Sequence, residues 1–165
     1  MIGTFLDLSS GLLNGEAITE VRRTVGDLND YWDNPAGVDP TQLLYTTQTY
    51  RADLDGTEGA VLIGNTVLYA GEVNGELFMT RGHWHTNRSR GELVVGVSGK
   101  GVVLLLDSEG ASHELPLSPG QIQWIEGKYA HRTINTGTEP LVFLCTWPAD
   151  CGHDYDVIGR FPVIR

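Results

Sequence analysis

Short runs of β-forming residues alternate with turn residues from Leu43 onward, at steps of about ten positions. The stretch from Val102 to Leu106 is continuously apolar, as in a buried strand, whereas Pro119-Gly120 is a turn signal. The runs of this kind are 43–51, 60–68, 77–85, 92–97, 102–106, 112–117, 121–125, 130–134 and 141–147. Their number and spacing predict an all-β sandwich or barrel and argue against a parallel α/β sheet.

The segment that precedes these runs has a helical pattern. Apolar residues recur there at three- and four-residue steps, at Ile18, Val21, Val25 and Leu28. This spacing predicts one amphipathic helix over residues 16–28, followed by a loop. A chain of 165 residues suffices for one domain with a single core. The predicted domain, 1–165, has an N-terminal arm and helix over 1–42, a β-barrel over 43–158 and a tail over 159–165.

Charge and cysteine content narrow the class of protein. The formal net charge of −10 argues against a nucleic-acid backbone or an anionic membrane as partner. The two cysteines, Cys145 and Cys151, do not make a disulfide framework. No apolar run approaches the roughly 20 residues that span a bilayer, and the N-terminus lacks a secretory pattern. We therefore expect a protein of the reducing cytoplasm.

Three histidines and one glutamate form the most informative group of residues. On a strand, His83 and His85 point to the same face because side chains alternate. The polar run 86–91 has turn composition, so Glu92 can return beside them on the next strand. His131 lies in a later strand-like run. Each histidine alone is compatible with an ordinary core or surface position, but together the four favour a site for iron, manganese, nickel or zinc.

The same residues resemble the two sequence motifs of the cupin superfamily. The first motif, His-x-His with a later Glu and Gly, reads here His83, His85, Glu92 and Gly99. The second motif begins at Gly120 and ends with His131 and Asn135. Glu126 and Lys128 depart from it, because they stand where Pro and Gly are usual. The resemblance implies a cupin fold, a double-stranded β-helix or jelly-roll barrel, here with a small N-terminal helix.

The long gap between His85 and Glu92 resembles one branch in particular, the cupin-type glucose-6-phosphate isomerases. Further stretches that resemble this branch are 21–31, 66–69, 79–85, 130–137 and 148–155. The resemblance implies an enzyme that interconverts glucose 6-phosphate and fructose 6-phosphate. It also implies one divalent metal ion per chain, with Fe²⁺ as first choice and Mn²⁺, Ni²⁺ or Zn²⁺ as alternatives. The ligands would be His83, His85, Glu92 and His131.

Roles for further residues follow from this resemblance and from ordinary chemistry. A divalent ion that chelates two sugar oxygens can stabilise an enediolate, with Glu92 as the proton-transferring base. A hydride shift would need only the ion, so both routes stay open. His153 and Tyr155 would help to open the sugar ring. The predicted substrate and phosphate site comprises Tyr45, Thr66, Thr80, Gly82 and the nearby cation Lys128, with Arg81 as a further cation to test.

The rim of the predicted site departs from the relatives. Val94 and Trp147 stand where tyrosines are usual, and Lys128 where an aromatic residue is usual. These changes leave open an isomerase or epimerase of another phosphosugar. A cupin oxygenase and a non-enzymatic sugar-phosphate sensor are further alternatives. The early helix and first strand resemble elements that pack between subunits, so we expect a homodimer.

Overall fold

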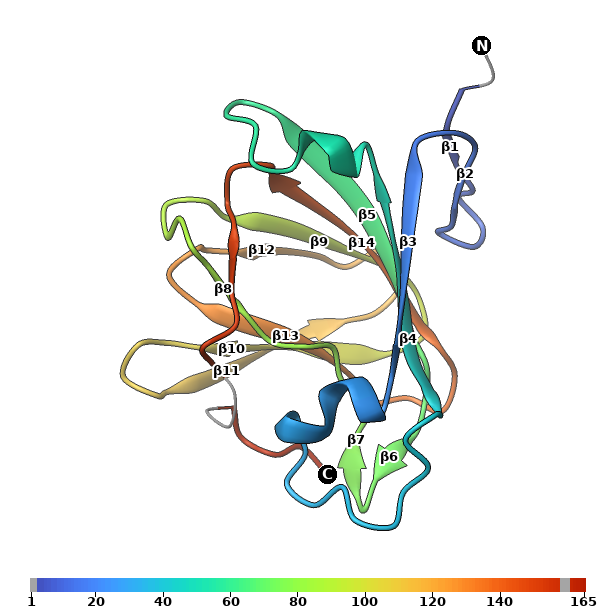
Figure 1. Cartoon of the computed structure of the whole chain (residues 1–165), viewed down its shortest axis with the longest axis vertical. Coiled ribbons are helices and arrows are strands. Elements are labelled where there is room, and N and C mark those ends of the chain that lie inside the picture. The colour runs from blue at the N-terminus through green and yellow to red at the C-terminus, as the bar shows by residue number, and fades with distance from the viewer. Residues whose placement is uncertain (1–2, 158–160) are drawn as a thin grey trace.

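The computed structural model describes residues 3–157 and 161–165 (Figure 1). Residues 1–2 of the predicted arm, 158 of the predicted barrel and 159–160 of the predicted tail lie outside the described residues. The strands are β1 (Phe5–Leu6), β2 (Leu13–Asn14), β3 (Ile18–Thr24), β4 (Leu43–Tyr50), β5 (Val61–Leu68), β6 (Glu72–Val73), β7 (Glu76–Leu77), β8 (Trp84–His85), β9 (Glu92–Ser98), β10 (Gly101–Leu106), β11 (Ser112–Leu117), β12 (Ile122–Ile125), β13 (Ala130–Asn135), β14 (Leu141–Pro148) and β15 (His153–Asp154). Two short 3₁₀ helices complete the elements, η1 (Gly26–Tyr31) and η2 (Ala52–Leu54).

Two antiparallel sheets enclose one interior. The larger sheet has six strands in the order β12-β9-β14-β5-β4-β3, and Figure 1 shows it curving around one side of the molecule. The smaller sheet has the order β11-β10-β13, and bridges at Met79↔Ile134 and His83↔His131 extend it toward β8 and β15. The predicted all-β barrel is therefore confirmed.

The core fills the space between the two sheets. All six residues of β13 are buried, because one face of this strand looks into the barrel and the C-terminal segment covers the other. On that outer face the guanidinium of Arg132 lies 4.7 Å from the centre of the Phe161 ring and donates to the carbonyl of Pro162. Large side chains that are fully buried include Leu44, Leu68, Phe78, Met79, Leu104, Leu106, Ile125, Ile134 and Leu141.

The predicted helix over residues 16–28 is wrong. Residues Ile18–Thr24 form β3, which pairs with β4 along its whole length, and only Gly26–Tyr31 coils, as η1. The three- and four-residue spacing suggested a helix, but β-branched residues such as Ile18 and Val21 favour a strand when a partner strand is available. That partner lies some twenty positions further along the chain, beyond the reach of a local pattern.

The N-terminal arm, β1 with β2, packs on the outer face of the larger sheet. The side-chain amide of Asn65 donates to the carbonyl of Gly11 at 2.8 Å, and the Gln48 side chain accepts from the backbone N–H of Leu13 at 2.9 Å. These bonds tie the arm to β4 and β5, while Phe5 and Leu8 on the arm remain exposed.

The two cysteines of the chain are free thiols. Cys145 belongs to β14, and Cys151 is buried in the turn that follows this strand. Burial raises the pKa of Cys151 to about 12 and, with the nearby Glu92, holds the pKa of Cys145 well above its usual value. Among the described residues, none of the helices has the length and apolar character needed to cross a bilayer.

Candidate metal centre and substrate cavity

The four predicted ligands converge between the two sheets. One ligand atom from each of His83, His85, Glu92 and His131 lies within 4.8 Å of the others. Glu92 is the first residue of β9 in the larger sheet, whereas the histidines belong to the smaller sheet and its extension. The backbone groups of His83 and His131 exchange two hydrogen bonds, of 3.2 and 3.0 Å, which place their rings 4.4 Å apart.

The hydrogen bonding of these side chains fits a bound cation. The Nε2 atoms of His83, His85 and His131 are buried without a hydrogen-bond partner in the structure. The Oε2 atom of Glu92 lies 3.4 Å from the Nε2 atoms of His85 and His131. A buried polar atom without a partner costs about 1–3 kcal/mol, so an ion that accepts several lone pairs at once removes a considerable penalty. Three imidazoles with one carboxylate suit a divalent transition metal.

Charge states at the cluster also suit a metal. Burial, together with His131, holds the pKa of His83 well below its usual value. Burial alone would raise the pKa of Glu92, but the adjacent side chains of His131 and His85 keep it well below its usual range. Burial lowers the pKa of His85, whereas Glu92 and the Arg90 carbonyl raise it above the usual value on balance. Neutral imidazole and ionised carboxylate are the ligand forms, so metal binding at His85 competes with protonation of its ring.

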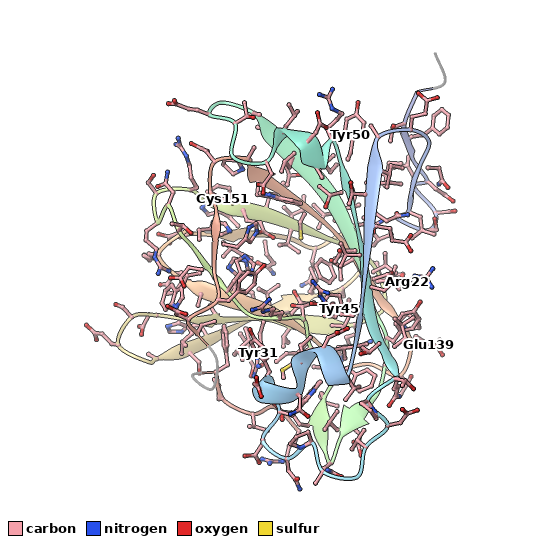
Figure 2. All side chains as sticks on the ribbon, in the orientation of Figure 1. Arg22, Tyr31, Tyr45, Tyr50, Glu139 and Cys151 are labelled. Carbon is pink, nitrogen blue, oxygen red and sulfur yellow. The ribbon has the colours of Figure 1, made fainter. Side chains whose placement is uncertain are left out.

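A cavity of about 340 Å³ opens beside the cluster and is lined by His83, Glu92 and His131. This size lies within the range of pockets for small ligands. Of the other predicted site residues, five line the same cavity, namely Tyr45, Thr66, Thr80, His153 and Tyr155. Figure 2 labels Tyr45 on β4, and Tyr31 at the end of η1.

The segment after β14 places His153 and Tyr155 at the cavity. In the β15–β8 pair, His153 stands opposite His85, and the His153 ring lies 4.7 Å from that of His83. Burial on the cavity side, together with His85, lowers the pKa of His153. Burial raises the pKa of Tyr155, against the opposing charge of Arg81. At neutral pH, the first side chain is therefore a proton acceptor and the second a proton donor.

Three arginines line the cavity, and two of them, Arg23 and Arg81, supply positive charge to it, because the guanidinium of Arg132 packs on the ring of Phe161. Arg81 lies with its guanidinium carbon 3.6 Å from the centre of the Tyr155 ring, and its Nε donates to the hydroxyl of Tyr31 at 2.6 Å. Its backbone N–H points to the Tyr45 hydroxyl at 3.5 Å. Arg23, from β3, lines the cavity next to Tyr45 across the β3–β4 pair.

Two predicted substrate residues lie elsewhere. The ammonium of Lys128 pairs with Glu126 at 2.9 Å, and Lys128 lines a different hollow with Trp84 and Arg88. Closeness in sequence to His131 was misleading, because the turn before β13 directs Lys128 away from the barrel interior. Gly82 does not line the cavity, and a Cβ at this position would clash with the ring of Phe161. Its small size therefore serves packing of the C-terminal segment.

Sequence reasoning missed Arg23 and Thr47 as cavity residues. Both point inward on adjacent strands, and Thr47 stands opposite Thr66 on β5. Strand alternation could have identified Thr47, because side chains two residues apart share a face, and Tyr45, Thr47 and Thr49 therefore lie on the same face of β4. Arg23 could not be identified in the same way, because residues 16–28 were interpreted as a helix.

Known proteins resemble this chain over most of its length. A sequence model of the family described as glucose-6-phosphate isomerase (GPI) matches residues 28–162. The glucose-6-phosphate isomerase of Thermococcus kodakarensis is 37% identical over 161 residues, which are 95% of this chain and 83% of that protein. That of Pyrococcus horikoshii is 35% identical over 166 residues, 96% of this chain and 85% of that protein. A putative glucose-6-phosphate isomerase 2 of Rhizobium meliloti is 31% identical, over 94% of this chain and 79% of that protein.

Solved structures share the fold at lower sequence identity. Oxalate decarboxylase of Bacillus subtilis, a protein with Mn(II) centres, has a TM-score of 0.51 and 20% identity, over 72% of this chain and 28% of that one. The capsular polysaccharide assembling protein CapF of Staphylococcus aureus has a TM-score of 0.51 and 19% identity, over 68% of this chain and 27% of that one. Both neighbours are cupins, so the predicted cupin architecture is confirmed.

Proposed function

This chain belongs to the glucose-6-phosphate isomerase family, and we propose that it is a metal-dependent enzyme that interconverts glucose 6-phosphate and fructose 6-phosphate. One observation carries the metal dependence. Four side chains from two sheets, three of them buried, bring their ligand atoms within 4.8 Å of one another, on the wall of a cavity that also holds hydroxyls and arginines.

The proposed ligands are His83, His85, Glu92 and His131, and Fe²⁺ is the first ion to test, followed by Mn²⁺, Ni²⁺ and Zn²⁺. When bound, a divalent ion supplies Lewis-acid polarisation of the sugar carbonyl and of the neighbouring hydroxyl. The donor set of three imidazoles and one carboxylate accepts all four ions.

Glu92 is the proposed base that moves a proton between C1 and C2 of the sugar. Its carboxylate is ionised, buried and part of the cavity wall, so it can accept a proton from a bound substrate. In the alternative hydride shift, Glu92 serves only as a ligand. Substrate carrying deuterium at C2 distinguishes the routes, because proton transfer through Glu92 exchanges the label with water and a hydride shift retains it.

His153 and Tyr155 are proposed to open the sugar ring. Ring opening removes a proton from the hydroxyl on C1 and delivers one to the ring oxygen. His153 accepts the first proton as a neutral imidazole, and Tyr155 donates the second from its phenol. Their rings are stacked with centres 6.2 Å apart, so both can reach one sugar.

The phosphate is proposed to lie among Tyr45, Thr66 and Thr80, close to the arginines Arg23 and Arg81. The hydroxyl of Thr80 accepts from the backbone N–H of Thr133 at 2.9 Å, which leaves its own proton free to donate. Two guanidinium groups in the same cavity favour a doubly charged phosphate over a neutral group. Lys128 is left out, because it pairs with Glu126 outside this cavity.

A coupled assay for fructose 6-phosphate tests the proposed function. The purified chain is stripped of metal, reloaded with one of the four ions at a time, and supplied with glucose 6-phosphate. Turnover that requires both the ion and the phosphate supports the proposal. Absence of turnover with every ion contradicts it. Because Trp147 lines the cavity where relatives carry tyrosine, the same assay extended to other aldose phosphates tests the alternative substrate.

We further propose that the chain forms a homodimer and works in the cytoplasm. Exposed apolar side chains on the arm, at Phe5 and Leu8, offer a surface for a second copy. Two free thiols suit a reducing compartment. Light scattering at several concentrations measures the mass, and replacing Phe5 and Leu8 by Ser should shift it toward that of one chain.

A further inference from the structure

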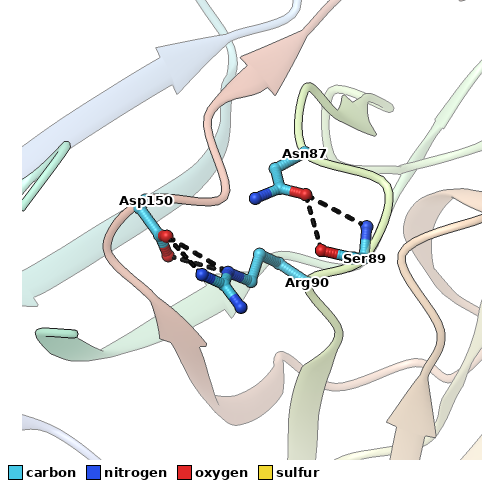
Figure 3. A network of polar contacts seen from close by, with 4 residues as sticks. All are labelled: Asn87, Ser89, Arg90 and Asp150. Carbon is cyan, nitrogen blue, oxygen red and sulfur yellow. Dashed lines mark hydrogen bonds and ion pairs between the residues drawn. The ribbon is translucent and has the colours of Figure 1, made fainter. Parts of the chain in front are cut away.

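Arg90 makes two contacts that point in different directions from the loop between His85 and Glu92. Its backbone carbonyl accepts a hydrogen bond of 2.7 Å from Nδ1 of His85. Its guanidinium donates to the carboxylate of Asp150, with Nε 3.1 Å from each oxygen and Nη2 2.7 Å from Oδ2 (Figure 3). One residue therefore joins a proposed metal ligand to the segment that follows β14.

We propose that the Arg90–Asp150 ion pair is a positioning clamp for the metal ligand His85. A carbonyl only accepts, so the bond to Arg90 fixes the proton on Nδ1 and leaves Nε2 as the ligand atom. The bond also sets the rotation of the ring, because Nδ1–H has to point at the carbonyl. Movement of the Arg90 backbone would turn Nε2 away from Glu92.

Other contacts hold the start of the loop. The backbone N–H groups of Thr86 and Asn87 donate to the carbonyls of Gly152 and Cys151, and Arg88 pairs with Asp154 at 3.2 Å. Asn87 also accepts from the N–H and the hydroxyl of Ser89 (Figure 3). The Arg90–Asp150 pair adds a contact to the segment after β14 at the residue whose carbonyl His85 uses. The Arg90 carbonyl is confined on another side by Gly127, where a Cβ would clash with it.

The other end of the clamp is firmly held. The backbone N–H of Ala149 donates to Ala60 at 2.9 Å, and the carbonyl of Cys151 accepts from Asn87 at 2.8 Å. Asp150 lies between these two anchors and three residues before His153. The ion pair therefore adds to the β15–β8 pairing in setting the spacing between the ligand loop and the strand that carries His153.

The ion pair is partly exposed to solvent, so its effect on the metal ligand can be distinguished from an effect on folding stability. The side chains of Arg90 and Asp150 are 37% and 17% exposed, and partly exposed ion pairs contribute about 0–1 kcal/mol to folding. Loss of the pair should leave the fold nearly unchanged. Loss of an outer partner of a metal ligand lowers metal affinity by about 10–100-fold.

Binding of Co²⁺ and Zn²⁺ in competition with a chromogenic chelator tests the clamp in Asp150→Asn and Arg90→Lys. Both variants should bind these ions about 10–100-fold more weakly, with little change in melting temperature. The matched control is Arg51→Lys at the start of η2. In the parent, Arg51 donates two hydrogen bonds of 2.8 Å to the carboxylate of Asp53. An affinity within twofold of the parent in both variants overturns the proposal.

This inference rests on the proposed metal centre, and a second measurement separates the two. In the metal-free parent, NMR should show the Nδ1–H of His85 as a slowly exchanging, downfield resonance. The signal should be lost or shifted in both variants and kept in the Arg51→Lys control. If the parent binds no ion, the proposed function fails. The clamp is then still supported if the resonance is lost or shifted in both variants, and it is overturned if the resonance stays unchanged in them.

Discussion

At the scale of the residue, Glu92 meets two demands at once. It stays ionised although it is buried, because the adjacent side chains of His131 and His85 offset the cost of burial. It also forms part of the cavity wall, where a substrate carbon can reach it. A neutral amide of the same shape keeps the size of this side chain but loses both functions.

We expect Glu92→Gln to lower kcat by about 10²–10⁴-fold and to weaken metal binding. The amide cannot accept a proton and is a poorer ligand than a carboxylate. Steady-state kinetics at saturating metal, with elemental analysis of the protein, measures both effects. The control is Glu126→Gln, at an exposed carboxylate outside the cavity. A kcat within tenfold of the parent at full metal content would contradict the assigned role.

Arg23→Met should raise KM for the sugar phosphate by about 10–100-fold and change kcat by only a few fold. A hydrogen bond to a charged group contributes about 1.5–3 kcal/mol, which corresponds to this range. Lys128→Met is the matched control, since Lys128 lies outside the cavity, and its KM should equal that of the parent. If Lys128→Met raises KM more than Arg23→Met does, the assignment of Arg23 to the phosphate site is wrong.

At the scale of the element, the turns decide how strands meet around the barrel. Gly99, between β9 and β10, has φ of 77°, and a Cβ there would clash with the carbonyl of Pro140. Gly110, between β10 and β11, has φ of 91° but open space around it. The two glycines share a backbone conformation that disfavours side chains, and they differ only in packing.

Gly110→Ala should lower the free energy of unfolding by about 1–2 kcal/mol, the cost of the left-handed backbone. Gly99→Ala should cost about 1–3 kcal/mol more, because the start of β14 has to move. For a chain of this size, each kcal/mol shifts the melting temperature by about 2–4 °C. Thermal unfolding of both variants measures this difference. Equal shifts in melting temperature would show that the clash between residue 99 and the carbonyl of Pro140 is relieved without cost.

Most barrel strands were predictable, and the first long strand was not. The predicted strand 77–85 is interrupted, because only β7 and β8 form there and Met79 and His83 make isolated bridges. Elsewhere in 43–147, short β-forming runs between turn residues were sufficient to locate the strands. Residues 18–24 become a strand only because β4 lies beside them, and no local pattern reports a partner from another part of the chain. For the same reason, the sequence did not identify Arg23 as a cavity residue, and it placed Lys128 closer to the site than the structure does.

At the scale of the whole molecule, the proposed metal site joins the two sheets. Glu92 comes from the larger sheet, and the three histidines come from the smaller sheet and its extension. The convergence of these four residues was predictable from motif spacing, because strand alternation fixes the faces of His83 and His85. Their exact distances depend on how the sheets pack, which the sequence alone does not specify.

Removing the metal should lower the melting temperature by about 5–11 °C. An ion at about 100 times its dissociation constant stabilises by about 2.7 kcal/mol, at about 2–4 °C per kcal/mol. The stabilisation requires deprotonated imidazoles, so it should be present at about pH 7.5 and lost as the pH falls toward about 5. Calorimetry with and without a chelator at both pH values measures it. Equal melting temperatures at about pH 7.5 would argue against a structural contribution from the ion.

The buried thiol of Cys151, in the turn after β14, makes the protein its own reporter of opening. Only a thiolate reacts readily with an alkylating reagent, and burial raises the pKa of Cys151 to about 12. In the folded state this sulfur is therefore protonated and shielded, whereas Cys145 lines the cavity. The rate at which iodoacetamide modifies Cys151 at neutral pH then measures how often this edge of the barrel separates, without any added probe.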